Sequence, residues 1–184
     1  MMRWHASLAA LTSCLKAKRR FRNMFGFDKK KVELVAPCAG QSVALEQIND
    51  PVFSQKMLGD GVAIVPEAAD ELIIAAPATG TVKQLFKSLH AFVICTEEGL
   101  DILVHIGMDT VALKGEGFTA LAAKGDKVTA GTGIVKVNAA HLRSKDVDLT
   151  TPIVMSEKKQ VASVDVARPG PVRAGAKLAV VTLA

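Results

Sequence analysis

The sequence predicts an all-β fold, an antiparallel sandwich or barrel with only short helical turns. Three observations indicate this. From Val32 onward the chain consists of short apolar runs, these runs are separated by Gly, Pro and Asp, and two sequence patterns occur twice. Many short strands at regular spacing are typical of β-sandwiches and barrels.

Eight apolar runs are predicted to be strands. In chain order they are Val32–Ala36, Val62–Val65, Leu72–Ala75, Ala91–Cys95, Ile102–Ile106, Ile134–Val137, Gln160–Val166 and Leu178–Leu183. Turn sequences such as Gly59-Asp60-Gly61, Glu97-Glu98-Gly99 and Pro169-Gly170-Pro171 lie between them, and such residues favour turns over strands. Two short helices are expected, at Phe53–Lys56 and Ala139–Lys145.

Two patterns recur within the chain. The pattern Ala36-Pro37-x-x-Gly40 returns as Ala76-Pro77-x-x-Gly80, and Val128-x-Ala130-Gly131 returns as Val172-x-Ala174-Gly175. Repeats of this kind predict a sandwich built from two related halves. Chance similarity among Ala-rich and Gly-rich turns is the alternative.

Composition limits the class of protein. The chain has 184 residues, 49% of them apolar, which suits one domain with a sizeable core. It has seven Phe, one Trp and no Tyr, so a base-stacking surface for nucleic acid is not expected. The three cysteines, Cys14, Cys38 and Cys95, are odd in number and form no Cys-x-x-Cys pair. Neither a disulfide framework nor a structural zinc site is expected, and a cytoplasmic location fits best.

The net charge of +5 is concentrated at the N-terminus. Residues 1–31 hold nine Lys or Arg and one acid, Asp28, so this segment carries about +8 and the remainder about −3. We therefore expect a basic, flexible tail at residues 1–31 and a folded domain at residues 32–184. Such a tail indicates weak contact with an anionic membrane surface.

Export is not expected. No apolar run is long enough to span a membrane. The run from Ala6 to Leu15 is short for a signal peptide. Only Arg3 precedes it, and the basic cluster follows it, on the wrong side. The segment that begins at Met24 is typical of a natural start.

Two histidines form the most informative pattern. The strand-like segments Phe86–Cys95 and Leu100–Ile106 are joined by a short loop that ends in Gly99, which predicts a hairpin. A loop symmetric about the Glu97–Glu98 bond places His90 directly opposite His105. Their Cβ atoms would then be about 4.5–5.5 Å apart. A bulge in the loop would shift this register.

Three interpretations of the pair are open. In the first, each histidine has a structural role and, where it is buried, a hydrogen-bond partner. The pair could ligate zinc, but zinc needs three or four protein ligands, so His90 and His105 would do so only with a partner. The third is phosphoryl transfer, in which one imidazole is the nucleophile and the other donates an N–H to the phosphoryl oxygens.

The surrounding residues favour phosphoryl transfer. Asp109 and Asp50 could orient imidazole protons or repel the phosphoryl group after transfer, although Asp50 before Pro51 is also a typical turn cap. Three phenylalanines near the pair predict a dry docking patch for a protein partner: Phe53, Phe86 and Phe92. Singly, each would be a core residue. No Gly-x-x-x-x-Gly-Lys-[Ser/Thr] motif supports nucleotide binding.

From about Val32 to Leu183 the chain resembles the glucose-type enzyme IIA family of the bacterial sugar phosphotransferase system. The block His-Ile-Gly-Met-Asp-Thr-Val followed by Lys-Gly-Glu-Gly-Phe is highly specific. The resemblance rests on these segments: Leu58-Gly59-Asp60-Gly61-Val62-Ala63-Ile64, His90-Ala91-Phe92, Val104-His105-Ile106-Gly107-Met108-Asp109-Thr110-Val111 and Lys114-Gly115-Glu116-Gly117-Phe118.

The resemblance implies the fold, the reaction and the site. The family fold is a duplicated hybrid motif, a barrel-sandwich. His105 matches the phosphorylated histidine, His90 the supporting histidine, and Asp50 and Asp109 the flanking acids. Phosphate would pass from the phosphocarrier HPr to His105 and on to a sugar-specific IIB domain, for glucose or N-acetylglucosamine. No cofactor, nucleotide or metal is implied, and regulatory protein partners are expected.

Two residues depart from the family pattern. Ser88 stands where many members have Thr beside the supporting histidine and keeps the hydroxyl, and Leu103 replaces a common Phe. Val111, within the specific block, is expected on the partner-docking surface.

Two other classes share this architecture. A biotinyl or lipoyl module needs a modified Lys at a hairpin tip, and Asp126-Lys127-Val128 is a poor match. A zinc peptidase needs a His-x-His pair, which the sequence lacks.

Overall fold

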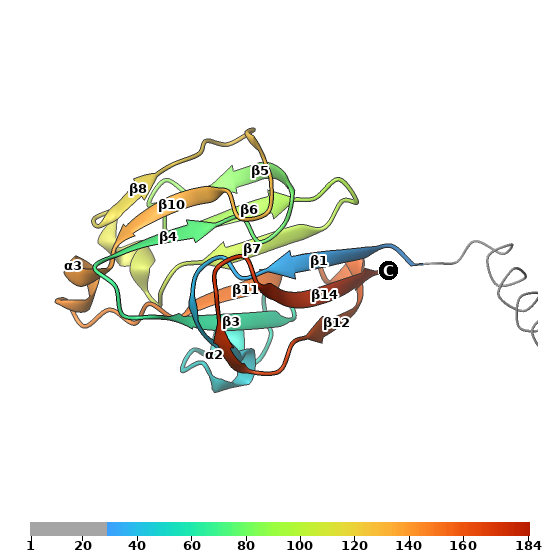
Figure 1. Cartoon of the computed structure of the whole chain (residues 1–184), viewed down its shortest axis with the longest axis horizontal. Helices are drawn as coiled ribbons and strands as arrows, with labels where there is room; N and C mark the ends of the chain where they lie inside the picture. The colour runs from blue at the N-terminus through green and yellow to red at the C-terminus, as the bar shows by residue number, and fades with distance from the viewer. Residues whose placement is uncertain (1–28) are drawn as a thin grey trace, which may run out of the picture.

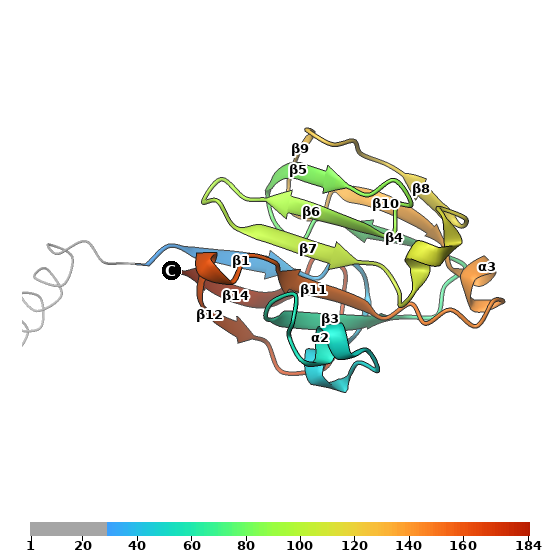
Figure 2. The same cartoon turned by 180° about the vertical axis from the view of Figure 1, so that it is seen from behind.

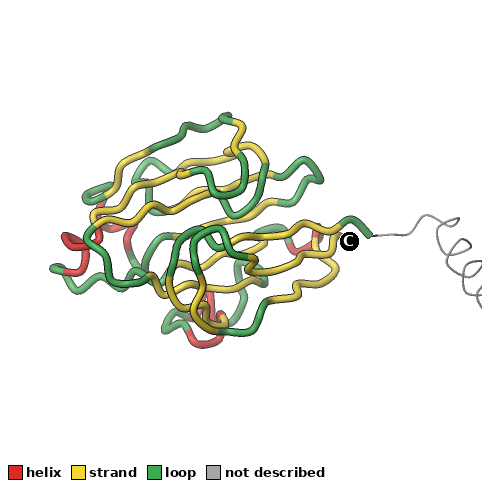
Figure 3. The backbone as a smooth tube through the Cα atoms, viewed as in Figure 1, coloured by secondary structure: helices red, strands yellow, loops and turns green. Residues whose placement is uncertain are grey.

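The computed structural model describes residues 29–184 (Figure 1). The expectations for the N-terminal segment up to Asp28 lie outside these residues. Strands account for most of the described structure, and the helices are short turns at its periphery (Figure 3). None of the helices in this part of the chain has the length and apolarity needed to cross a membrane.

The strands form three antiparallel sheets. The largest has the order β13 (Gly170–Val172), β2 (Gly40–Ala44), β3 (Gly61–Pro66), β11 (Thr151–Met155), β7 (Asp101–His105), β6 (Ala91–Cys95), β5 (Gly80–Leu85) and β9 (Lys127–Val128). The two smaller sheets are β1 (Lys31–Val35), β14 (Lys177–Leu183), β12 (Val161–Val166), and β4 (Glu71–Ala75), β10 (Gly133–Asn138), β8 (Phe118–Ala120).

The remaining elements are single turns of helix. Two are α-helical, α2 (Pro51–Ser54) and α3 (Ala139–Arg143), and three are 3₁₀ turns, η1 (Leu45–Gln47), η2 (Thr110–Leu113) and η3 (Lys158–Gln160). The predicted all-β sandwich is confirmed. All eight predicted strands are present with ends within one residue. The helix predicted at Phe53–Lys56 has the same length but begins two residues earlier, and the one predicted at Ala139–Lys145 ends two residues earlier.

The internal repeats mark equivalent positions in two interlocked halves. Gly40 pairs with Val172 between β2 and β13, and Gly80 pairs with Val128 between β5 and β9. The halves also exchange reciprocal hydrogen bonds: Val35 N–H donates to the Pro77 carbonyl over 2.8 Å, and Ala75 N–H donates to the Pro37 carbonyl over 2.9 Å. The duplication is therefore real.

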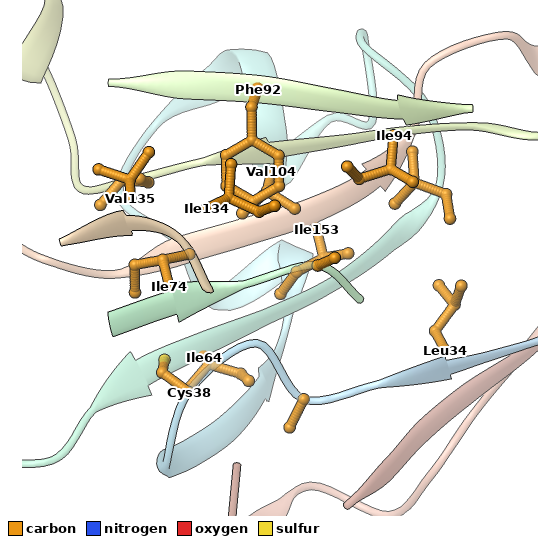
Figure 4. Packing of buried hydrophobic residues seen from close by; sticks show 14 of the residues in the cluster. Leu34, Cys38, Ile64, Ile74, Phe92, Ile94, Val104, Ile134, Val135 and Ile153 are labelled. Atoms are coloured by element: carbon orange, nitrogen blue, oxygen red, sulfur yellow. The ribbon is translucent and has the colours of Figure 1, made fainter. Parts of the chain in front are cut away.

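The main core lies between the sheets. Leu34, Ile74, Phe92, Val104 and Ile153 are buried there together (Figure 4). Since side chains alternate across a strand, the intervening residues of β3, β7 and β11 face the other side of the large sheet.

A second, smaller cluster covers that other side. It consists of Leu45, Ile48, Phe53, Ala63 and Val154, with Val43, Leu103 and Met108 packed against it. The turns η1 and α2 lie over these strands (Figure 2). This cluster lies next to the candidate site, because its member Phe53 packs on His105.

Candidate active site

The hairpin β6–β7 has a register one residue away from the prediction. Ala91, not His90, lies opposite His105. The loop holds three residues, because Thr96 N–H donates to the Leu100 carbonyl and Gly99 N–H to the Thr96 carbonyl. Gly99 has φ of 90°, and a glycine with positive φ is the bulge residue typical of three-residue hairpin loops. The predicted direct opposition is therefore wrong.

The two histidines nevertheless meet. Their ring centroids are 5.2 Å apart and the ring planes are inclined at 71°. His90 lies just before β6, in a turn where Leu89 has φ of 55°, so strand alternation does not fix the side to which its ring points. The His90 carbonyl accepts a hydrogen bond from Ile106 N–H over 2.7 Å, which ties this turn to the end of β7.

Each ring has one nitrogen with a defined partner. His105 Nδ1 lies 2.8 Å from the Gly107 carbonyl oxygen. A carbonyl can only accept, so Nδ1 carries the proton and Nε2 keeps a free lone pair. His90 Nδ1 lies 2.6 Å from the Ser88 hydroxyl. When that hydroxyl donates, His90 Nε2 carries the proton and becomes a donor.

Burial keeps both imidazoles neutral. His90 is buried, whereas His105 is partly exposed. Burial lowers the pKa of His90. Burial also lowers the pKa of His105, aided by the positive charge of a protonated His90 and opposed by the Gly107 hydrogen bond and by the charges of Asp50 and Asp109. The accessible His105 ring is thus in its neutral form at neutral pH, with one proton on Nδ1.

The two aspartates flank His105 in different ways. Asp50 caps α2, because its Oδ1 accepts a hydrogen bond from Val52 N–H over 2.7 Å. Asp109 begins η2 with φ of 54° and makes no side-chain cap. Both carboxylates act on the pKa of His105. Asp50 is therefore at once the turn cap that the sequence allowed and a charge beside the site.

Two of the three phenylalanines pack on the histidine rings, and the third lies in the main core. Phe53 packs on His105 with centroids 5.3 Å apart, and Phe86 packs on His90 at 5.2 Å. Phe53 is only 4% exposed, so it is a wall of the site with little docking surface. Phe92 is fully buried beside Val104 in the main core (Figure 4). The expectation that Phe92 belongs to a surface patch is wrong.

Exposed apolar side chains lie elsewhere around the pair. Val111 on η2 is 56% exposed, and its place on a docking surface stays a prediction. Three further apolar side chains that were not singled out from the sequence are exposed on α2 and the turn after it: Val52, Met57 and Leu58.

The protein's own backbone explains why position 107 is a glycine. A Cβ on this residue would lie 2.8 Å from the Asp148 carbonyl oxygen, and its φ is 71°. The close neighbour at Gly107 is thus the protein's own backbone at Asp148.

The histidine pair alone offers two metal ligands, whereas zinc takes four. No group of three or more His, Cys, Asp or Glu residues within positions 29–184 is arranged to hold a metal ion.

Comparison with known proteins gives one consistent answer. Residues 32–161 match the family model of the phosphoenolpyruvate-dependent sugar phosphotransferase system, EIIA 1. The glucose-specific EIIA component of Oceanobacillus iheyensis is 39% identical over 147 residues, covering 78% of this chain and 87% of that protein. The structure of glucose permease IIA from Mycoplasma capricolum superposes with a TM-score of 0.76 at 34% identity, covering 84% of this chain and 97% of that one.

A further relative is much longer. The glucose-specific EIICBA component of Streptococcus pneumoniae is 40% identical over 162 residues, covering 88% of this chain. The matched part spans 22% of that relative.

Fold, site and relatives define a phosphoryl-carrier protein of the phosphotransferase type. The chain belongs to the EIIA 1 family of the phosphoenolpyruvate-dependent sugar phosphotransferase system. Neither the biotinyl or lipoyl module nor the zinc peptidase is favoured by these findings.

Proposed function

We propose that His105 accepts a phosphoryl group from the phosphohistidine of HPr and donates it to a sugar-specific IIB domain in the cytoplasm. The observation that carries this proposal is the state of the His105 ring. Its Nδ1 proton is engaged by the Gly107 carbonyl, so Nε2 has a free lone pair on a partly exposed side chain.

The transfer is an exchange of one nitrogen–phosphorus bond for another. The lone pair on Nε2 of His105 attacks phosphorus, and the donor's nitrogen–phosphorus bond breaks with its electron pair left on the donor imidazole. In the second step an acceptor side chain, such as a cysteine thiolate, attacks phosphorus and the electron pair returns to Nε2. No cofactor takes part in either step.

His90 would act as the neighbouring donor. Its ring lies 5.2 Å from that of His105 between centroids, and its Nε2–H can point at the phosphoryl oxygens. A hydrogen bond to a charged acceptor is stronger than one between neutral groups. Asp50 and Asp109 would repel the bound phosphoryl group and so favour its departure.

The sugar and the partners are proposed from the relatives. Both the Oceanobacillus EIIA component and the Mycoplasma permease IIA are named for glucose, and the Streptococcus relative is named as a joined EIICBA component. We therefore propose glucose uptake, with N-acetylglucosamine as the second candidate. Docking would use Val111 and Phe86 together with the exposed residues of α2.

The test is phosphorylation with phosphoenolpyruvate, enzyme I and HPr, followed by mass spectrometry of the labelled peptide. Wild-type protein should carry one acid-labile, base-stable phosphate on His105, as expected for a nitrogen–phosphorus bond. His105→Ala should carry none, whereas His141→Ala, a change at a histidine whose ring binds Glu116, should label normally. Labelling of His105→Ala at the wild-type rate would overturn the proposal.

A further inference from the structure

One peptide group orients the His105 ring, and this group is held at both ends. The carbonyl of the Gly107–Met108 peptide accepts the His105 Nδ1 proton over 2.8 Å. The N–H of the same peptide, on Met108, donates to the Asp148 carbonyl over 2.7 Å. Since a trans peptide is planar with its C=O and N–H pointing in opposite directions, the Asp148 carbonyl decides which way the Gly107 carbonyl points.

The residue that provides this carbonyl, Asp148, is held through its side chain by a clamp. Asp148 Oδ1 accepts two hydrogen bonds from Thr150, one from N–H over 2.8 Å and one from the hydroxyl over 2.6 Å. Asp148 is exposed, but Thr150 is 8% exposed and begins the entry into β11. A buried residue at the start of an interior strand of the large sheet thus fixes an exposed loop residue.

We propose that the Asp148–Thr150 clamp is a positioning device that sets the tautomer of His105. It rests on the proposed function, because a tautomer with the proton on Nδ1 matters only if Nε2 is the phosphoryl acceptor. Neither residue touches the imidazole. They act through the Asp148 carbonyl and the Gly107–Met108 peptide, like the outer hydrogen bonds that orient a ligating histidine in a metal site.

The reverse arrangement shows why orientation matters. If the Gly107–Met108 peptide turned over, its N–H would face His105 Nδ1 in place of its carbonyl. An N–H needs an acceptor, so Nδ1 would lose its proton and Nε2 would gain one. The accessible nitrogen would then have no lone pair for phosphorus.

Two neighbouring threonines offer a matched pair of variants. Thr150→Val removes the hydroxyl bond to Asp148 Oδ1, and Thr151→Val removes the Thr151 hydroxyl bond to the Leu149 carbonyl, 2.9 Å long. Both residues are buried, so both variants lose one buried hydroxyl from the same segment. Asp148→Ala, at an exposed position, removes the clamp without changing the core, and Asp148→Asn keeps an oxygen acceptor.

The measurement is ¹⁵N NMR of the His105 ring above its pKa, which distinguishes a protonated from an unprotonated Nδ1 without any partner protein. Wild type, Thr151→Val and Asp148→Asn should show Nδ1 protonated. Thr150→Val and Asp148→Ala should show a mixture, and their single-turnover acceptance from phospho-HPr should fall by the same factor as the Nδ1–H population.

Unchanged tautomers in both Thr150→Val and Asp148→Ala would overturn the positioning role, even if His105 is the acceptor. An equal shift in Thr151→Val would do the same, because it would assign the effect to a general loss of packing. Failure of the proposed function would instead appear as labelling of His105→Ala.

Discussion

At the scale of single residues, His90 and His105 have the same chemistry and different settings. His105 is partly exposed and has its Nδ1 engaged by a carbonyl, whereas His90 is buried and has its Nδ1 on a hydroxyl. A nucleophile must be reachable and must hold a lone pair, and a supporting donor must be fixed in place. The assignment of roles follows from these partners and not from the order of the two residues in the sequence.

His90→Gln should separate acceptance from donation. Glutamine keeps an N–H donor but cannot become a cation. Acceptance needs mainly a free nitrogen on His105, so it should persist. Donation needs charge stabilisation as the group leaves, so it should slow by up to the roughly hundred- to thousandfold that complete loss of one such donor costs. Single-turnover transfer into and out of the variant measures both steps. Equal slowing of the two steps would make His90 a packing residue.

The acid limb of acceptance should lie below the ordinary imidazole pKa of 6.5, because burial lowers the pKa of His105. Acceptance needs the neutral ring, so it should persist at pH 6.5 and decline as the pH falls through the lowered pKa. The same shift predicts that the free energy of unfolding decreases as the pH falls from 6.5 through the lowered pKa, because the unfolded chain binds more protons in that range. NMR titration of the His105 ring checks this directly, and a midpoint above 6.5 would contradict it.

At the scale of secondary-structure elements, the eight strands with a strong apolar pattern were predictable and the register between two of them was not. Each of the eight apolar runs predicted between turn signals is a strand. The register of β6 and β7 depended on one residue, Gly99, whose positive φ adds a bulge to the loop. The histidines still meet, because a turn with an unusual φ at Leu89 carries His90 out of the strand pattern. Sequence alone does not show that turn.

Three of the strands that were not predicted, β2, β5 and β11, have local reasons for it. β2 is Gly-Gln-Ser-Val-Ala and β5 contains Lys83 and Gln84, so their apolar character is weak. β11 contains Pro152, which argues against a central strand. The structure accommodates it because Pro152 pairs with Ala63 of β3 but lies outside the pairing with β7, which begins at Ile153.

The buried side chain of Phe53 holds α2 against the large sheet and packs on the His105 ring. Phe53→Ala should destabilise the protein by about 3–5 kcal/mol, the usual cost of removing a buried Phe, and should slow acceptance because the wall beside the imidazole is lost. The neighbouring Val52 is 38% exposed, so Val52→Ala should change stability by no more than about 0.5 kcal/mol. Urea unfolding and single-turnover transfer measure the two effects. Equal losses of stability in both variants would argue against the anchoring role.

At the scale of the whole molecule, the duplication explains why there is one histidine site and not two. The pairing of Ala91 with His105 in one half corresponds to the pairing of Gly61 with Val154 in the other. Val154 is 1% exposed and lies in the second cluster. The position equivalent to His105 has thus been used to pack η1 and α2, which in turn provide the wall of the remaining site.

Charge is also distributed unevenly over the whole chain. Residues 1–28 hold six Lys or Arg and one acid. Since the full chain holds 23 basic and 18 acidic residues, the described part from Lys29 to Ala184 has 17 of each and no net charge. All of the formal excess therefore lies outside the domain that contains the histidine pair.

A chain that starts at Lys29 should accept phosphate from phospho-HPr at the full rate. Lys29 is chosen because the Lys30 carbonyl accepts a hydrogen bond from Leu183 N–H over 2.9 Å, which a later start would lose. The shortened chain should bind anionic vesicles less tightly, since each basic residue near such a surface contributes about 1 kcal/mol, and both chains should ignore neutral vesicles. Vesicle sedimentation and single-turnover labelling separate the two properties. A shortened chain that stays folded but no longer accepts phosphate would show that residues 1–28 form part of the site.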